Sequence, residues 1–210
     1  MKILVTAGPT REAIDPVRFI SNLSSGKMGY ALAGALIRAG HEVTLISGPV
    51  NLTPPEGLAE FVPVVSAADM AVAVKARFDA CSGVVMCAAV ADYRVAHPAK
   101  EKIHKMDGEL VLRLERTEDI LQTLGKLKKQ QILLGFAAET EELKAHALSK
   151  LERKNLDWIA ANQVGVPGRG MQADQNAVTL YGKSGAVIEF PLMGKRELAE
   201  KIVSAVFPAV

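Results

Sequence analysis

Acidic and lysine side chains gather in the stretch from Asp92 to Lys105, directly after the short apolar run Met86–Ala91. An aspartate at the carboxyl end of a buried strand lies where α/β sheets bind their ligands. A lysine in the loop that follows could close over bound phosphates and exclude water. The alternative is a solvated charged loop, the usual environment of lysine. These residue types predict a site for a phosphorylated ligand. Their spacing alone does not exclude the alternative, a solvated charged loop without a ligand.

A second candidate site is the stretch from Ser21 to Gly29, which holds serines, glycines and Lys27 at the start of a predicted helix. Free N–H groups and the helix dipole bind anions there; an ordinary helix cap is the alternative. It is not a P-loop, because Ser21 replaces the upstream glycine and Met28 replaces the final Ser or Thr. The phosphate-loop candidates, including two from the first turn, are Gly8, Thr10, Ser24, Ser25, Gly26 and Lys27.

The first turn, Thr6–Glu12, lacks the G-x-G-x-x-G pattern of dinucleotide-binding proteins, and Pro9 removes a backbone donor. The second predicted strand is followed by Ser47–Pro49 instead of an acidic residue. Tyr93 is followed four residues later by His97, not by the lysine of short-chain reductases. An NAD(P)-linked reductase and a non-catalytic nucleotide-binding regulator remain the alternatives to a phosphate-handling enzyme.

Short apolar runs alternate with helical patterns along the chain, which predicts a doubly wound, mostly parallel Rossmann-like α/β sheet. The expected strands are Ile3–Val5, Glu42–Ile46, Val84–Val90, Ile132–Phe136 and Trp158–Ala160. The expected helices are Lys27–Ala39, Ala67–Asp79, Glu118–Leu127, Glu141–Lys154 and an amphipathic last helix, Lys195–Phe207, that packs back on the core as a lid.

Two segments break the alternation. Tyr93–Arg116 has no helical period, so we expect a flap that ends in a strand at the alternating run Leu110–Leu114. Asn176–Phe190 alternates on both sides of the turn Lys183–Gly185, which predicts an appended β-hairpin. We expect residues 1–210 to form one domain that includes both segments.

The overall charge excludes some partners. Twenty-five Lys and Arg against 23 Asp and Glu leave a formal charge of +2, so nothing favours nucleic acid or an acidic membrane surface. Cys81 and Cys87 are too few for a disulfide framework and suit a reduced, cytoplasmic protein. No apolar run is long enough to span a bilayer, and no set of residues is nominated as a metal site.

Seven motifs, in this order, closely resemble phosphopantothenoylcysteine synthetase, the ligase family of coenzyme A biosynthesis. They are Gly8–Glu12, Asp15–Asn22, Ser24–Gly29, Ala88–Arg94, Glu101–Lys105, Gly135–Thr140 and Arg153–Asp157. Each motif is weak alone, but together they cover the chain from about Val5 to the final helix.

The resemblance implies a reaction in two steps, with Mg²⁺ as cofactor. The carboxylate of 4′-phosphopantothenate attacks the α-phosphate of CTP, which releases pyrophosphate and forms an acyl-cytidylate. The amine of cysteine then attacks the acyl carbon and expels CMP. The resemblance also implies a homodimer whose site is completed near the subunit boundary, and fusion to, or association with, a flavin-dependent decarboxylase. The residues do not decide between CTP and ATP.

The resemblance also implies the site residues. Lys102 is the flap lysine that reaches the triphosphate, Asn22 holds the acyl-cytidylate, and Arg18 pairs with a phosphate through its planar donors. The residues expected to bind nucleotide are Met86, Cys87, Ala88, Asp92, Lys102, Glu118, Asp119, Ile120, Leu121, Phe136, Lys150 and Lys154. Each of these residues could instead have a purely structural role. These roles are a surface salt bridge for Arg18, a turn for Asn22 and Asp92, a place in the hydrophobic core for Phe136, and a solvated helix face for Lys150 and Lys154.

This chain departs from the family pattern at two places. His104 interrupts the family's basic cluster, and we expect a surface residue there. The turn Thr117–Ile120 replaces Asn-Pro-Asp-Ile, a change that matters little if backbone N–H groups make the contacts.

Overall fold

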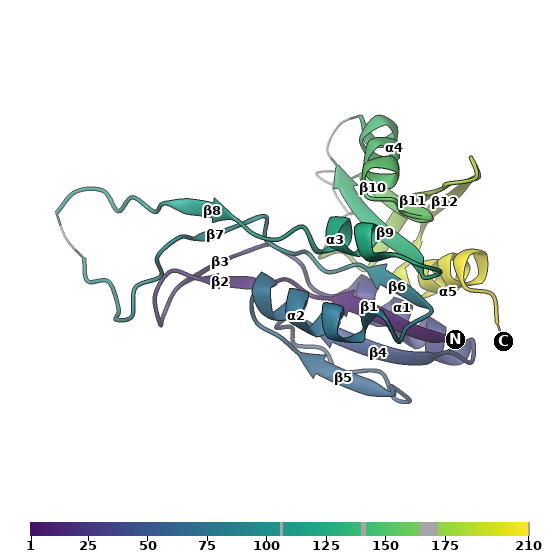
Figure 1. The fold of residues 1–210 in the computed structure, drawn as a ribbon, viewed down its shortest axis with the longest axis horizontal. Helices are drawn as coiled ribbons and strands as arrows, with labels where there is room; N and C mark the ends of the chain where they lie inside the picture. The colour runs from purple at the N-terminus through teal and green to yellow at the C-terminus, as the bar shows by residue number, and fades with distance from the viewer. Residues whose placement is uncertain (106, 140–141, 164–171, 210) are drawn as a thin grey trace.

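A mixed, mostly parallel sheet forms the centre of the molecule (Figure 1). The computed structural model describes residues 1–105, 107–139, 142–163 and 172–209. Within these residues the central sheet has eight strands in the order β12-β11-β10-β9-β6-β1-β4-β5. They are β1 (Lys2–Ala7), β4 (Glu42–Ser47), β5 (Glu60–Pro63), β6 (Gly83–Met86), β9 (Ile132–Glu139), β10 (Trp158–Gln163), β11 (Gln175–Gly182) and β12 (Val187–Gly194). The strands from β5 to β10 are parallel, and β11 and β12 add the antiparallel hairpin.

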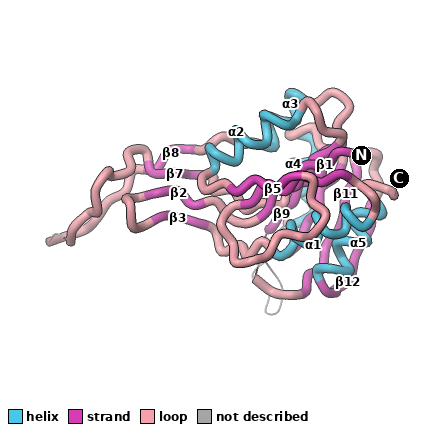
Figure 2. Tube along the Cα trace, turned by 90° about the horizontal axis from the view of Figure 1, so that it is seen from below, coloured by secondary structure: helices cyan, strands magenta, loops and turns pink. Residues whose placement is uncertain are grey.

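Helices cover both faces of this sheet, as Figure 2 shows from below. One face packs against α1 (Lys27–Arg38) and α5 (Lys195–Val206), and the other against α2 (Ala67–Phe78), α3 (Ile120–Leu127) and α4 (Leu143–Arg153). The central strands are buried on both sides, which explains their continuous apolar runs. The doubly wound α/β fold predicted from the sequence is therefore confirmed. None of the described helices has the length and apolarity needed to cross a bilayer.

An arm projects from the core (Figure 1). It contains the antiparallel pairs β2 (Arg11–Ala13) with β3 (Phe19–Ser21), and β7 (Tyr93–Val95) with β8 (Leu114–Arg116). Because β2 contacts β7, the flap and the first hairpin extend side by side. We call these two segments, residues 11–21 and 93–116, the arm.

Several expected element bounds are wrong. The strand expected over Val84–Val90 ends at Met86, because the next peptides bond to the first turn: Ala88 N–H to Thr6 Oγ1 and Ala89 N–H to the Gly8 carbonyl. The flap strand is Leu114–Arg116, not Leu110–Leu114, since its register is set by pairing with β7.

The helical predictions need smaller corrections. The helix expected from Glu118 begins at Ile120, because the Asp119 side chain caps it. The next helix begins at Leu143, and the expected start, Glu141, lies outside the described residues. The last helix packs back on the core as expected, with α5 beside α1. The sequence analysis did not predict β2, β3, β5 or β7.

Candidate active site

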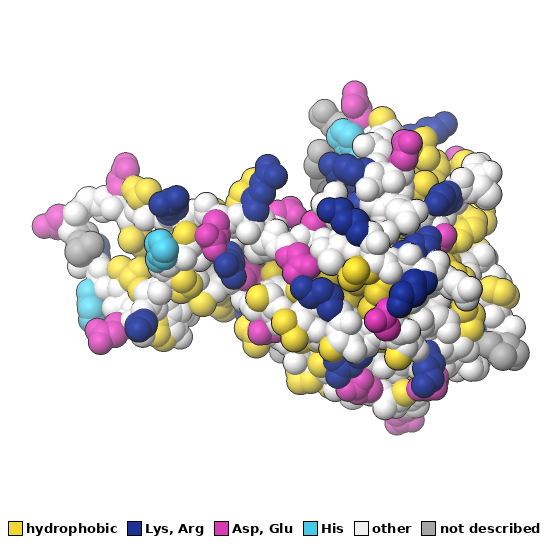
Figure 3. All heavy atoms as spheres, in the orientation of Figure 1, with side chains coloured by type: hydrophobic (Ala, Val, Ile, Leu, Met, Phe, Trp, Pro, Cys, Tyr) yellow, Lys and Arg dark blue, Asp and Glu magenta, His cyan; other side chains and the backbone are white. Residues whose placement is uncertain are grey.

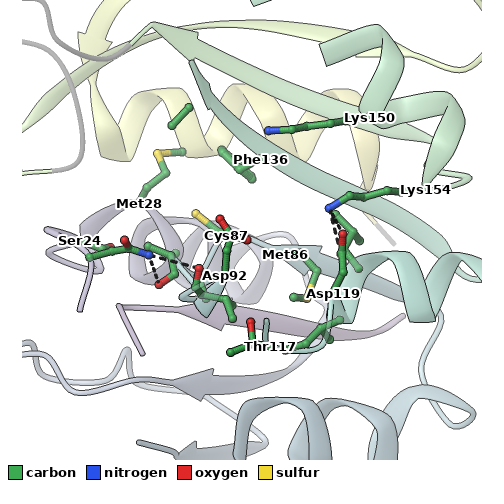
Figure 4. Close-up of a pocket in the computed structure, with 18 of the residues that line it drawn as sticks. Ser24, Met28, Met86, Cys87, Asp92, Thr117, Asp119, Phe136, Lys150 and Lys154 are labelled. Atoms are coloured by element: carbon green, nitrogen blue, oxygen red, sulfur yellow. Dashed lines mark hydrogen bonds and ion pairs between the residues drawn. The ribbon is translucent and has the colours of Figure 1, made fainter. Parts of the chain in front are cut away.

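A cavity of about 930 Å³ opens at the carboxyl ends of β1, β6, β9 and β10. The chain runs from β1 to β4 on one side and returns to β6 on the other, so these ends mark a topological switch point. Loops leave such a point in opposite directions and open a crevice in which α/β proteins bind ligands. Figure 4 shows lysines, an aromatic ring and carboxylates from different elements around this cavity.

The α3/α4 side of the cavity carries positive charge. Lys154 Nζ lies 2.9 and 2.8 Å from the two carboxylate oxygens of Asp119, and Asp119 Oδ1 also accepts the Gln122 N–H at 3.0 Å (Figure 4). Burial raises the pKa of Asp119, but the Lys154 ammonium and the capping N–H outweigh it and hold this pKa below its usual range. Lys150 lies one turn earlier on α4 and lines the same cavity. This wall can bind an anion such as a phosphate.

The opposite wall is the loop after β6 together with the start of α1. The Asn22 amide donates to the carbonyls of Ala89 and Val90 at 3.1 and 3.2 Å, so Asn22 is fixed against this loop. The N-cap Gly26 has φ 77°, a left-handed conformation that favours glycine. A Cβ on Gly29 would lie 2.6 Å from the Ala7 Cβ, so glycine there lets α1 approach β1. The N-terminal N–H groups of α1 are thus held at the cavity.

Cys87 forms part of the cavity wall beside Met86 and Phe136 (Figure 4). Burial raises the pKa of the Cys87 thiol to about 12. A thiol with such a pKa stays protonated at neutral pH and is a poor nucleophile. The structure therefore supports the interpretation of Cys87 as a wall residue.

Three buried polar residues in the cavity were not singled out from the sequence: Asn162 near the end of β10, Asn176 in β11 and Lys195 at the start of α5. All are more than nine-tenths buried. Burial lowers the pKa of Lys195, which lies near Lys27 and Asp174. The sequence did contain a signal for Asn162, because this amide follows the end of a predicted parallel strand, where ligands bind. Lys195 gave no such signal, because its hairpin brings it to the cavity from far along the chain.

The structure brings most of the predicted site residues together. Those that line the cavity are Asn22, Ser24, Gly26, Lys27, Met86, Cys87, Ala88, Asp92, Glu118, Asp119, Ile120, Leu121, Phe136, Lys150 and Lys154. Gly8, Thr10 and Ser25 do not line it. Thr10 is fully buried, and its hydroxyl accepts the Ala91 N–H, so it supports the loop from behind.

Arg18 and Lys102, which lie in the arm, do not line the cavity either. His104 is exposed in the same part of the arm, as expected for a surface residue.

The described residues contain no group of three or more His, Cys, Asp or Glu side chains that could hold a metal ion. Mg²⁺ does not require one, since it is commonly bound by one or two carboxylates together with substrate phosphates and water. Asp92 is exposed at the cavity and offers such a carboxylate. The donor set therefore fits a magnesium ion that arrives with a polyphosphate.

The fold and the cavity define a class: a doubly wound α/β protein with a polar, cation-lined ligand site at its switch point. Within that class, a family model described as DNA/pantothenate metabolism flavoprotein C-terminal domain matches residues 1–209, and the chain belongs to this family. This confirms the resemblance found in the sequence motifs.

Curated relatives and a solved structure agree with this assignment. The coenzyme A biosynthesis bifunctional protein CoaBC of Bacillus subtilis is 52% identical over 97% of this chain and 50% of its own length. The Escherichia coli protein of the same name is 44% identical over 98% of this chain and 51% of its own. The chain thus spans about half the length of these relatives. The crystal structure of a CoaBC C-terminal domain superposes with a TM-score of 0.84 at 46% identity, over 98% of this chain and 93% of that one.

Proposed function

We propose that this chain is a phosphopantothenate–cysteine ligase that uses CTP. The observation that carries the proposal is the cavity itself, which joins a cationic wall at Lys150 and Lys154 to the Asn22 amide and the α1 N-terminus. Such a cavity suits a nucleotide and the group that becomes attached to it. The relatives named for coenzyme A biosynthesis support the same reaction.

The cavity residues act by binding and orientation, with no covalent nucleophile from the protein. Phe136, Met86 and the loop at Cys87 and Ala88 hold the base of the nucleotide, and Lys150 and Lys154 hold its phosphates. Asn22, fixed against the loop carbonyls, lies where the acyl-cytidylate would be held, and the carboxylate of 4′-phosphopantothenate attacks the α-phosphorus. The carboxylate–phosphorus bond forms as the bond to pyrophosphate breaks. Preorganised donors and cations stabilise the charge that develops in this step.

Magnesium is the proposed cofactor. Asp92 would hold the ion beside the nucleotide, where it would neutralise phosphate charge. In the second step the cysteine amine attacks the acyl carbon, CMP leaves with the bonding electrons, and the amine loses its proton.

We also propose that the active unit is a homodimer. Arg18 and Lys102 do not line the cavity of their own chain, although the resemblance assigns both to the reaction. The arm exposes large apolar side chains: Val17, Phe19, Tyr93, Leu110, Val111 and Leu114. In Figure 3, hydrophobic side chains gather along the arm. Exposed apolar clusters of this kind mark protein–protein contacts, so the arm is suited to reach the cavity of a second chain.

The CoaBC relatives are bifunctional and about twice as long as this chain. We therefore propose a flavin-dependent decarboxylase as the fused or associated partner. The two cysteines are free, which suits the reducing cytoplasm as the place of the reaction.

The test is pyrophosphate release from 4′-phosphopantothenate, cysteine, Mg²⁺ and either CTP or ATP. We expect release with CTP that requires phosphopantothenate, and formation of phosphopantothenoylcysteine by mass spectrometry. Release that is faster with ATP would overturn the CTP assignment. The absence of release with both nucleotides, together with NADPH oxidation on a carbonyl substrate, would support the reductase alternative instead.

A further inference from the structure

Asp15 is a buried carboxylate at the tip of the β2–β3 hairpin, outside the cavity. Its side chain has no exposed surface, although the arm around it is open to solvent. Oδ1 accepts the N–H groups of Val17 and Arg18 at 2.9 and 2.8 Å. Oδ2 accepts Arg18 Nε at 3.0 Å, Arg18 Nη2 and the N–H of Ile103 at 3.1 Å. The last of these bonds joins two segments that are 88 residues apart.

The same cluster holds both polar groups of the Ile103 backbone. Arg18 Nη2, while bound to Asp15, also donates to the Ile103 carbonyl at 2.7 Å. A further hydrogen bond, from the Ala99 N–H to the Ile14 carbonyl at 2.9 Å, joins the flap to the same hairpin four residues before Ile103. The N–H held by Asp15 belongs to the peptide that links Lys102 to Ile103. The backbone of Lys102 is therefore held at one end by Asp15.

The charge of Asp15 is suited to this task. Its hydrogen bonds with the Arg18 guanidinium, more than any other contact, hold the pKa of this carboxyl far below its usual range. Asp15 therefore stays ionised and accepts from every donor around it. A bidentate bond from a guanidinium to a carboxylate also fixes the plane of the guanidinium. The orientation of Arg18 and the path of the flap thus depend on one side chain.

We propose that Asp15 is a positioning residue for the ligation, because it places both arm cations, Arg18 and Lys102, at once. The proposal rests on the proposed function, which assigns these two cations to the phosphate groups of the substrates. Asp15 itself touches no substrate. Its effect on the reaction is transmitted through the guanidinium of Arg18 and the peptide between Lys102 and Ile103.

The first test is Asp15→Asn, which preserves size but turns an N–H₂ group toward the donors of Arg18 and Ile103. We expect kcat for pyrophosphate release to fall on the order of 10–100-fold, as when positioning donors are lost. The Kd for CMP should not change, because CMP lacks the pyrophosphate that the arm would reach. Asp15→Glu restores the carboxylate and should recover part of kcat.

The second test reads the flap directly. Trypsin cleaves after Lys102, at the peptide whose N–H is bound to Asp15, and cleavage requires that this segment open locally. We expect cleavage there to be several-fold faster in Asp15→Asn than in the unmodified chain. Asp69→Asn is the matched control, because Asp69 also accepts backbone and side-chain hydrogen bonds, but in the capping box of α2. It should lower the melting temperature and leave kcat and cleavage after Lys102 unchanged.

The outcomes separate this inference from the proposed function. An active unmodified chain whose Asp15→Asn variant keeps its kcat and its cleavage rate would overturn the positioning role. So would an Asp15→Asn variant that loses CMP binding together with its fold, while Asp15→Glu recovers nothing. If the unmodified chain releases no pyrophosphate, the proposed function fails and the role of Asp15 in positioning Arg18 and Lys102 for the reaction fails with it. The cleavage rates would then still show whether Asp15 anchors the flap.

Discussion

Two lysine–aspartate pairs in this protein have similar geometry and different surroundings. Lys154 and Asp119 lie 2.8 Å apart at the cavity, and Lys128 and Asp157 lie 2.6 Å apart away from it. Asp157 Oδ2 also accepts the Leu133 N–H at 2.8 Å, so the second pair ties the start of β9 to the end of α3. Of these two lysines, only Lys154 lies at the cavity, where it can exchange its carboxylate partner for a ligand phosphate.

Lys154→Met should therefore weaken nucleotide binding. A hydrogen bond to a charged group contributes about 1.5–3 kcal/mol, so the Kd for CTP should rise about ten-fold or more. Isothermal titration calorimetry measures this change directly. The control is Lys128→Met, which should lower unfolding stability by roughly 1–3 kcal/mol and leave the Kd unchanged. Equal affinities of the two variants for CTP would show that Lys154 does not bind the nucleotide.

Cys87 provides a second prediction at this scale. With a pKa of about 12, roughly one thiol in ten thousand is ionised at pH 8. Iodoacetamide should modify native Cys87 far more slowly than the unfolded chain, as followed by mass spectrometry. Turnover of Cys87→Ala should stay within a few-fold of that of the unmodified protein, because Cys87 only forms part of the cavity wall. A loss of turnover as large as that expected for Lys102→Gln, which removes the arm lysine proposed to reach the triphosphate, would show instead that the thiol takes part in the chemistry.

Residue types and order along the chain were enough to predict most of the cavity lining. Asp92 and Phe136 could be named because each ends or follows a predicted strand and lies in a family motif, and Asn22 because it lies in such a motif. Lys195 could not be named, because a lysine that begins an amphipathic helix is normally exposed. Only the antiparallel hairpin brings it into a buried position, and sequence does not specify how that hairpin packs.

At the scale of elements, the close approach of α1 to β1 sets the position of the anion-binding N-terminus. Gly29 makes this approach possible, since a Cβ there would also lie 3.0 Å from the Ala7 Cα and 3.1 Å from the Thr6 carbonyl oxygen. These neighbours are the backbone and a short side chain of the central strand, so they cannot turn aside. The position of the whole helix depends on one missing methyl group.

Gly29→Ala should destabilise the protein by about 1–3 kcal/mol, the usual cost of overpacking a core. It should also weaken CTP binding, because the displaced helix carries its N-terminal N–H groups away from the cavity. Gly34→Ala on the same helix is the control: its Cβ would meet the flexible end of Arg38 at 3.3 Å. Alanine in a helix interior is favoured by about 0.5–1 kcal/mol over glycine, so this variant should be as stable or more stable. Denaturant unfolding measures both changes.

The four strands of the arm, which the sequence analysis missed or placed wrongly, have a common physical cause. β2, β3, β7 and β8 are three residues each, and most of their side chains are exposed or only partly buried. Such strands lack the apolar alternation by which strands are recognised. They form because they pair with each other and because Asp15 joins their loops, which are contacts between distant parts of the chain. The central strands were predictable because burial on both faces demands continuous apolar runs.

At the scale of the whole molecule, the arm separates Arg18 and Lys102 from the cavity they are proposed to serve. A mixing experiment tests whether they act on a second chain. Lys102→Gln impairs the arm and leaves the cavity intact, whereas Lys154→Met impairs the cavity and leaves the arm intact. If the arm acts in trans, co-refolding the two impaired variants should restore about a quarter of the native activity above the residual activity of each variant, because half of the dimers are mixed and each has one complete site.

Steady-state assays of the mixture and of each variant alone measure this recovery. Val111→Glu, which places a charge on the arm at a side chain that is 82% exposed, should abolish both the dimer and the recovery. Val72→Glu on α2, at a side chain that is 67% exposed, should change neither. Sedimentation velocity gives the oligomeric state. Recovery without a detectable dimer would contradict the proposed assembly.

The position of β1 at the middle of the sheet has a consequence for synthesis on the ribosome. β1 bonds on one side to β4 and on the other to β6, which ends at Met86, and β6 bonds in turn to β9. A nascent chain that has emerged only as far as β4 therefore has a central strand with one unpaired edge. Long-range parallel pairing is slow and leaves such edges exposed. We expect this strand to be the segment that chaperones must shield while the following residues emerge.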